Sequence, residues 1–552
     1  MVSRFSNITS DISYNSRIIF IKDGFKIFKD WWLIGAGGGA WRLLNFKYQS
    51  FLYWSTETHN YPLQVLVETG LIGIIILMLL FASIAFTFAK LCRKGEFEKD
   101  NGYISNVAVF TAIIFLIAHS VMDFDFSLSS IFLLAWQLVA VLNSGVRHYD
   151  LSVEYGLNKN NKQKIIKNNK LLNTNIKTLF YREINCYPLI MILVSIAILF
   201  WPIKFLRGQA YANDAFENFK ENNLDKALLL MEKAVNTDNL NAKYVTGYMP
   251  IASKPDVRIG YLDLLISKAE TVSKSSESNG NGEDKLALNS YISKAKELIK
   301  RVERQANYDA DLALNLGIFY LKTTDKDKGI EYINKSVGLK PLVPTQWQYK
   351  ANALYSLAMN FYQKGDIKNG LAYIDKILAI IDEAKKVNEQ NLSPFMFTIE
   401  TQKYLEKAYC IKNGIMDTDD IVFQSVFGMD IDNNNFADQL GVSDIAIVGN
   451  YLSEGIFRVS NQDQNLDPYI YTRTLDFEPN NVYKIEVKLA NRENVESVPF
   501  LIPGVTNKIG QLVLNGDIYS AEVSVVATSE INRLYIYVKD NYDIESIRVI
   551  KK

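Results

Sequence analysis

Two histidines in the first 145 residues are candidates for acid–base chemistry. His59 is followed by Asn60 in TETHNYPL, and His119 is followed four residues later by Asp123 in AHSVMDFDFS. Histidine titrates near neutral pH, so it is the natural base or hydrogen-bond partner for a hydroxyl that loses a proton. His119 and Asp123 lie at the edge of an apolar stretch, where ionisable side chains indicate a functional site.

Two arginines in the same region are candidates to bind an anionic group. Arg17 precedes a glycine-rich run, Gly35 to Gly39, and Arg42 follows it. A guanidinium group can hold phosphate oxygens with two parallel hydrogen bonds. The glycine run itself is not a P-loop, because no Gly-Lys-Ser/Thr follows, and it does not follow a strand of a βαβ unit. It predicts a sharp turn of the backbone instead.

Each candidate also has a structural interpretation that the sequence leaves open. His59 and Asn60 can form a helix cap or a surface pair, and His119 with Asp123 can cap a helix end. Arginines near a membrane surface often bind lipid headgroups. For His59 the spacing described below favours function over a cap.

These residues must be positioned by membrane helices. Four apolar segments can cross roughly 30 Å of hydrocarbon, at about residues 70–90, 104–122, 128–142 and 187–205. The first, GLIGIIILMLLFASIAFTFAK, has no charge before its end. The second contains His119, the third is short, and the fourth carries Tyr187 and Trp201 as interface anchors.

The loop charges predict which way these segments run. The link after the first segment and the link 143–186 are rich in Lys and Arg, so the positive-inside rule makes both cytoplasmic. The acidic link 123–127 is then outside, together with the residues before 61 and after 207. A nucleic-acid role for the basic link is the weaker alternative.

An amphipathic helix is expected ahead of the first segment. Apolar residues recur three or four positions apart on one face: Ile18, Ile21, Phe25, Phe28 and Trp32. Lysines occupy the rest of the helix, which suits a helix lying in the membrane interface. An ordinary helix that packs this face into a protein core is an equally good interpretation.

The segments SRIIFIKDGFKIFKDWWLIGAGGGAW and TETHNYPLQVLVETGLIG resemble the C-terminal catalytic part of the O-antigen ligase and polymerase family. The family signature is His, then Asn, Ser or Gln, nine residues, Gly, two residues, and Gly, Thr or Tyr. His59-Asn60, Gly70 and Gly73 fit it completely. AHSVMDFDFS resembles the later His-Ser-x-x-Asp stretch of the family. The resemblance covers about the first 145 residues.

The resemblance implies glycan transfer on the outer face of a bacterial plasma membrane. The donor would be a glycan on undecaprenyl pyrophosphate, and the acceptor a lipid, a protein or a growing polysaccharide. His59, Arg17 and Arg42 would be catalytic; Asn60, Gly70, Gly73, His119 and Asp123 would bind substrate. The scheme needs no metal or other cofactor.

The polar remainder of the chain is predicted to form two further regions. Residues 206–415 contain helix–turn–helix patterns with small residues at matching positions, Ala227, Gly329 and Gly370, and resemble degenerate tetratricopeptide repeats, which stack and recruit protein partners. Residues 420–552 alternate apolar and polar residues between turns. They predict an antiparallel β-sandwich. This domain either binds carbohydrate through Tyr469, Tyr471 and Tyr483 or is an inert structural domain.

The predicted fold class is therefore multi-domain: an outer loop (1–62), an α-helical polytopic membrane region with about four spans (63–205), α-α repeats (206–415) and a β-sandwich (420–552). Sixty basic and sixty acidic residues balance, so net charge predicts no nucleic-acid partner. Three scattered cysteines indicate neither a disulfide framework nor a zinc site. Because the resemblance begins near Met1, we expect the chain to act as a fragment of a larger enzyme. The alternative is a non-catalytic membrane scaffold that recruits glycan-assembly partners.

Overall fold

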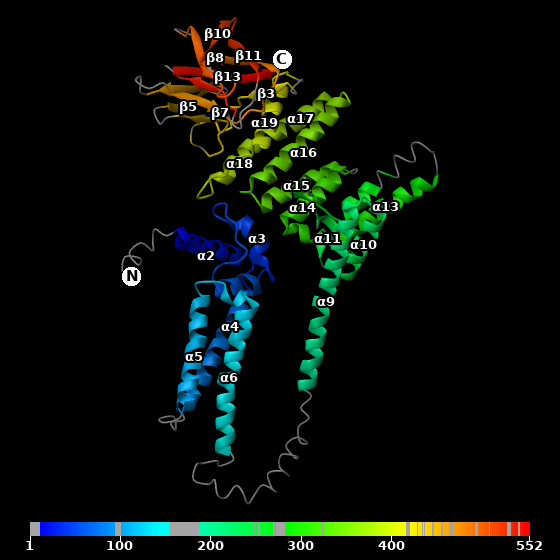
Figure 1. The fold of residues 1–552 in the computed structure, drawn as a ribbon, viewed down its shortest axis with the longest axis vertical. Coiled ribbons are helices and arrows are strands. Elements are labelled where there is room, and N and C mark those ends of the chain that lie inside the picture. The colour runs from blue at the N-terminus through cyan, green and yellow to red at the C-terminus, as the bar shows by residue number, and fades with distance from the viewer. Residues whose placement is uncertain are drawn as a thin grey trace, which may run out of the picture. The chain divides into compact units, whose positions relative to one another are not determined.

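The fold is taken from a computed structural model of the chain (Figure 1). It describes residues 12–93, 101–154 and 187–552, with gaps at 240, 248, 252–253, 269–270, 272–281, 323–324, 416–419, 428, 433, 435, 444–446, 454–455, 463–467, 492–494, 507, 527–531 and 539–540. The chain forms two compact units. The first comprises residues 1–49 and 54–305, and the second residues 50–53 and 306–552.

Two helices precede the apolar region, α2 (Ile12–Asp30) and α3 (Ala40–Tyr48). The face of α2 that is buried in the protein consists of Phe20, Asp23, Gly24 and Ile27. A Cβ on Gly24 would lie 2.8 Å from the side chain of Leu63, so α2 packs closely on the helix α4 (Tyr61–Arg93). The apolar stripe predicted from the sequence is a different face, with Phe25 46% and Trp32 54% exposed.

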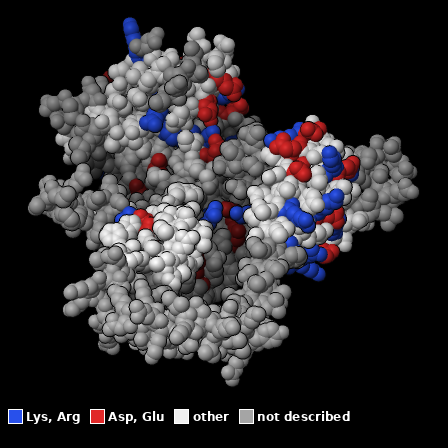
Figure 2. All heavy atoms as spheres, turned by 60° about the horizontal axis from the view of Figure 1, so that its bottom comes forward, with Lys and Arg blue, Asp and Glu red and all other residues white. Residues whose placement is uncertain are grey.

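Three apolar helices follow, α4 (Tyr61–Arg93), α5 (Asn101–Ser120) and α6 (Ser129–Glu154), and the short 3₁₀ helix η3 (Asp125–Ser127) joins the last two. They meet in a small core around Ile84, Ile113 and Leu142. Many other apolar side chains on these helices are exposed, including Phe86, Phe115 and Leu133. In Figure 2 the surface of these helices is largely uncharged, whereas charged side chains gather over other helices. Helices that are apolar all round are typical of membrane proteins.

One helix among the described residues, Tyr61–Lys90 within α4, is long and apolar enough to cross a membrane. Ser105–Ser120 and Ser129–Ser144 are shorter apolar helices. The predicted second and third spans therefore coincide with helices that fall short of that length. The predicted fourth span forms the start of α9 (Tyr187–Lys220), whose first side chains, like the basic link 155–186, lie outside the described part of the chain.

The polar helical region contains helix hairpins with a shared design. The second helix of each hairpin, α10 (Leu224–Thr237), α15 (Lys326–Leu339) or α17 (Ile367–Leu378), begins at an Asn or Asp whose side chain accepts a hydrogen bond from the third backbone N–H of the helix. Four residues after each cap (Asn223, Asp325 and Asp366) stands a buried small residue (Ala227, Gly329 and Gly370). A Cβ on Gly329 would lie 2.8 Å from the Leu321 side chain, so small residues there let paired helices approach closely.

The other elements of this region are α11 (Ala242–Thr246), β1 (Met249–Ile251), β2 (Lys254–Ile259), α13 (Gly282–Val302), η5 (Gln305–Asn307), α14 (Ala310–Lys322), α16 (Pro344–Gln363), α18 (Ile380–Asn388) and α19 (Ile399–Lys412). Helices α14 and α16 are the first helices of the hairpins completed by α15 and α17. The helical nature of this region agrees with the prediction, while its assignment to tetratricopeptide repeats stays a prediction.

The C-terminal part is antiparallel β structure, as expected. The strands are β3 (Ile421–Gln424), β4 (Leu440–Val442), β5 (Ile447–Ser453), β6 (Ile456–Asn461), β7 (Tyr469–Thr472), β8 (Asn481–Leu489), β9 (Ser497–Leu501), β10 (Gly510–Asn515), β11 (Ile518–Val525), β12 (Tyr535–Tyr537) and β13 (Asn541–Lys551). They form one 11-stranded sheet in the order β4-β7-β12-β9-β10-β11-β8-β13-β6-β5, with β3 beside β13. We expected two layers of a sandwich; the strand pairing instead joins all these strands in one continuous sheet, which curls around its apolar core.

The structure changes the candidate sugar platform. Tyr483 is fully buried in the core of the sheet, so it cannot offer a ring to a ligand. Tyr469 and Tyr471 on β7 stand beside Tyr535 and Tyr537 on β12. The rings of Tyr469 and Tyr535 stack on each other, with centroids 4.5 Å apart and planes 9° apart. Since these rings cover each other, this arrangement favours cross-strand stabilisation.

Candidate active site

The turn that carries His59 is fixed by its neighbours. Asn60 accepts a hydrogen bond from the Leu63 backbone at 2.8 Å, which caps the start of α4. Its side-chain amide donates to the Val121 carbonyl at 2.8 Å, which ties the turn to the end of α5. The Thr58 hydroxyl donates to the Asn60 carbonyl at 2.7 Å. His59 itself has a φ of 51°, a strained conformation for a residue with a side chain and one that concentrates at functional sites.

The structure brings together three residues predicted separately, His59, Asp123 and Arg17. Nδ1 of His59 lies 3.1 Å from Oδ1 of Asp123. The Arg17 guanidinium lies 3.8 Å from the other oxygen of the same carboxylate. Each side chain is about one-third exposed. The carboxylate thus lies between a histidine and an arginine at the edge of the apolar helices, and a solute can reach all three.

Two aromatic rings hold the imidazole of His59 in place. Phe20 on α2 stacks on it, with centroids 5.9 Å apart and planes 28° apart. Phe124 meets it edge-on at 4.9 Å. With Nδ1 directed at Asp123, these rings fix the plane of the imidazole and leave Nε2 as the nitrogen available to a substrate. A carboxylate on Nδ1 is the usual means of setting the tautomer of a histidine base.

The environment of Asp123 favours its ionised form. Partial burial would raise the pKa of Asp123, but the backbone N–H of Phe124 at 2.9 Å, the hydrogen bond with His59 and the charge of Arg17 together lower it. At neutral pH this carboxylate is therefore an anion that can orient His59 and stabilise a positive charge on its ring.

His119 forms a separate pair nearby. Its Nδ1 contacts the carboxylate of Asp125, the first residue of η3, and the ring is half-exposed. The carbonyl of His119 accepts the backbone N–H groups of Met122 and Asp123, which closes the end of α5. The capping interpretation thus holds for the backbone of His119, while its imidazole remains accessible.

Gly70 marks a kink that docks the glycine-rich loop. Its φ of 67° and ψ of −160° interrupt α4. At the break the Val67 and Glu68 carbonyls accept the backbone N–H groups of Ala36 and Gly37, both at 2.9 Å. The N–H groups of Leu71 and Ile72 donate to the carbonyls of Trp32 and Leu33. Four peptide groups at the kink are thus bound by the loop, which suits a helix in a membrane, where backbone polar groups need protein partners.

Both glycines at this contact are required by space. A Cβ on Gly70 would lie 2.4 Å from the Gly35 nitrogen, and one on Gly35 would lie 2.3 Å from the Glu68 carbonyl carbon. Gly73, one turn later, leaves room for Thr69, whose hydroxyl would lie 1.7 Å from a Cβ there. The spacing of the signature therefore has a structural basis, and substrate contacts of Asn60, Gly70 and Gly73 stay predictions.

Arg42 is placed differently from Arg17. It is exposed on α3, and its charge acts on Glu57. The pKa of Glu57 is raised, chiefly by burial and further by the charge of Glu68. The hydrogen bond from Ser127 and the charges of His59 and Arg42 act in the opposite direction. Arg42 therefore lies on the Glu57 side of the site, and its catalytic role stays a prediction.

Glu68 and the aromatic residues of the site have no role in the sequence-based prediction. Glu68 accepts the Gly39 backbone N–H at 3.0 Å and the Gln64 amide at 2.6 Å, so it holds the start of α3 against α4. In the sequence, this role of Glu68 is indicated by its position two residues before Gly70. No sequence feature indicated the contact of Phe20 with His59, because Phe20 does not lie on the predicted apolar face of α2.

Comparison with known proteins finds one family model that matches part of this region. No curated protein matches the chain. The stretch that a family model matches, residues 2–78, ends within α4. It includes Arg17, Arg42, His59, Gly70 and Gly73, whereas Asp123 lies beyond it. Residues 2–78 match the family model described as O-antigen ligase, a family of membrane proteins, and at family level this match indicates ligase- or polymerase-type glycan transfer.

Proposed function

We propose that this chain transfers a glycan from a polyprenyl-pyrophosphate carrier to an acceptor hydroxyl on the outer face of the membrane. The observation that carries the proposal is the His59–Asp123–Arg17 cluster, built on the turn that the family signature describes. It joins a candidate base, an anion that orients it and a candidate phosphate ligand in one place.

The three side chains divide the work of the transfer. Nε2 of His59 takes the proton of the acceptor hydroxyl as its oxygen attacks the anomeric carbon, while the bond from that carbon to the pyrophosphate oxygen breaks. Asp123 stabilises the imidazolium that results. Arg17, 3.8 Å from Asp123, can turn its guanidinium to the departing pyrophosphate.

The exposed stripe of α2 supports a membrane-interface position for this site. Phe25 and Trp32 point away from the protein core, although the helix already has a second, buried face that packs on α4. Lys22, Lys26 and Lys29 are also exposed, which suits contact with anionic headgroups and a lipid-linked donor. The candidate spans α5, α6 and α9 complete the proposed multi-pass arrangement.

The test is the variant His59→Ala in a bacterial strain whose surface glycan depends on this chain. We expect glycan transfer to fall by about a hundredfold or more, because a positioned base contributes roughly 10²–10⁴ in rate. Immunoblots for glycan and for protein measure the effect. His148→Ala is the matched control, since His148 lies on the predicted cytoplasmic side.

Normal glycan output from His59→Ala at normal protein level would refute the catalytic assignment. If output then still depended on the presence of the chain, the scaffold function would account for it.

The outer-face placement has its own test. A cysteine placed at Ser55 should react with an impermeant reagent in intact cells, whereas one at Asn160 should react only after lysis. For this test Cys92, Cys186 and Cys410 are first replaced, so that the reagent can react only with the introduced cysteine. Labelling at Asn160 in intact cells would reverse the orientation and remove the outer-face transfer with it.

A further inference from the structure

A loop between β3 and β4 has a spacing of oxygen-bearing side chains that suits a cation. Asp430, Asp432, Asn434 and Asp438 occupy positions 1, 3, 5 and 9 of the sequence DIDNNNFAD. Alternate positions of this kind supply the ligands of calcium-binding loops, with a backbone carbonyl at position 7, here Phe436. The loop departs from the EF-hand pattern, because positions 6 and 12 are Asn435 and Gly441.

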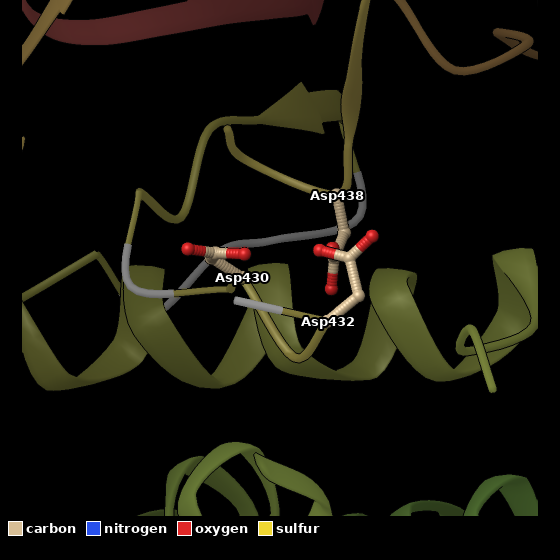
Figure 3. Close-up of side chains that lie close together, drawn as sticks. All are labelled: Asp430, Asp432 and Asp438. Atoms are coloured by element: carbon tan, nitrogen blue, oxygen red, sulfur yellow. The ribbon is translucent and has the colours of Figure 1, made fainter. Parts of the chain in front are cut away.

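The three carboxylates converge in the folded chain. The atoms that Asp430, Asp432 and Asp438 can offer to an ion all lie within 4.8 Å of one another. Figure 3 shows the three side chains together in one loop, with the carboxylates of Asp432 and Asp438 facing each other. Three carboxylates held this close repel one another when they are ionised, and a cation among them would relieve that repulsion.

A buried oxygen of Asp438 gives independent support for a ligand. Oδ1 of Asp438 is enclosed by the protein and accepts no hydrogen bond in the part of the chain that the structure describes. The other oxygen accepts the Ile431 N–H at 3.0 Å. Asp430 is only 5% exposed. Leaving a buried carboxylate oxygen without a partner costs free energy, and a cation at the cluster would satisfy it.

The loop is held in position by the helical part of the same unit. Asn388 at the end of α18 donates to the Ile431 carbonyl at 2.8 Å. Met429 and Ile431 are fully buried in a core shared with α16 to α19. The charge of Lys385, also on α18, acts on Asp430 and Asp438.

We propose that Asp430, Asp432 and Asp438 bind a calcium ion that fastens this loop between the helical region and the sheet. All the available side-chain ligands are oxygens, which suits a hard cation and does not suit zinc or copper. An irregular loop with carboxylate, amide and carbonyl oxygens fits the flexible coordination of calcium better than the strict octahedron of magnesium. The site is structural and is separate from the His59–Asp123–Arg17 cluster.

The test uses the full chain, purified in detergent and freed of metal with EDTA. Calcium chloride is titrated by calorimetry, and thermal unfolding is followed with and without calcium. We expect a dissociation constant of roughly 10⁻⁴–10⁻³ M, as in extracellular calcium modules, and a rise of the melting temperature by a few degrees. Magnesium chloride at the same concentration should give a clearly smaller rise.

Asp432→Asn and Asp438→Asn should each weaken calcium binding about tenfold or more, since affinity follows the number of charged ligands. Without calcium Asp438→Asn should melt no lower than the wild type, because it removes a repelling charge while its remaining oxygen can still accept the Ile431 N–H. Asp382→Asn, an exposed carboxylate on α18, is the matched control and should bind calcium as the wild type does.

A wild type that neither binds calcium nor gains stability from it would overturn the proposal. Unchanged calcium affinity in Asp432→Asn and Asp438→Asn would do the same. Equal effects of magnesium and calcium would overturn the assignment of the ion.

Discussion

Contacts from several parts of the chain fix the position of His59. Its backbone is held at positive φ by the Thr58–Asn60 turn, and its ring is bounded by Phe20, Phe124 and Asp123. Of these, Asp123 is the residue whose charge decides what the ring can do, because it fixes which nitrogen faces the open side.

Asp123→Asn tests this relation without removing volume. We expect glycan transfer to fall by about tenfold or more, since the amide keeps the contact but not the charge that stabilises an imidazolium. Normal transfer would show that Asp123 only shapes the turn.

The stability of the same variant should depend on pH. The pKa of Asp123 is lowered in the folded chain, so its contribution to stability is present above the ordinary aspartate pKa of about 3.9 and is lost as the pH falls through the lowered value. The melting temperatures of wild type and Asp123→Asn should therefore differ at neutral pH and converge in acid. A difference that stays constant down to about pH 2 would contradict the assignment of this charge.

Among the elements of the site, helix α4 organises the others. Its capped start presents His59, and its kink at Gly70 receives the loop that joins α2 to α3. Glu68 adds a hydrogen bond to the start of α3. The turn that carries His59 and the arginine-bearing helices therefore depend on one contact between two stretches of backbone.

Gly70→Ala should loosen this contact. The substitution places a Cβ 2.4 Å from the Gly35 nitrogen. It also forces a residue with a side chain into a region of φ and ψ that is essentially restricted to glycine, which alone costs about 1–3 kcal/mol. We expect a melting temperature several degrees lower and reduced transfer.

Gly38→Ala is the matched control, because a Cβ there meets nothing within 4 Å. Equal effects of the two substitutions would show that the kink does not depend on close backbone contact.

At the scale of the whole molecule, a buried ion pair joins the last helix to the sheet within the second unit. Arg473, just after β7, donates to Glu406 on α19 at 2.8 and 3.0 Å, and both side chains are at most 5% exposed. Gln439 donates to the same carboxylate at 2.6 Å. If this network governs the contact between α19 and the sheet, we expect the helix and the sheet to unfold together.

Arg473→Leu should cost about 3–5 kcal/mol, because it leaves the Glu406 carboxylate buried without its cation. Asp476→Asn removes the exposed pair with Lys403 and should change stability by less than about 1 kcal/mol. Urea unfolding of the two variants measures the difference. A cost for Arg473→Leu as small as that of Asp476→Asn would show that helix and sheet are held mainly by apolar contacts.

Much of the local structure follows from the sequence alone. The His59-Asn60 spacing, the apolar helices, the paired helices with Ala227, Gly329 and Gly370, and the antiparallel strands were predicted because each depends on neighbours a few residues away. Periodicity of apolar residues, caps and turn residues is a local property that sequence records directly.

Only the tertiary structure decided how these parts combine. It brought Asp123 and Arg17 to His59 across separations of 64 and 42 residues, turned Phe20 rather than Phe25 toward the core, buried Tyr483, and joined the strands in one sheet. It also gathered Asp430, Asp432 and Asp438 around a single point. Such contacts depend on packing between distant segments, where many pairings of apolar faces satisfy the same sequence pattern and only the combined packing of the folded chain selects one.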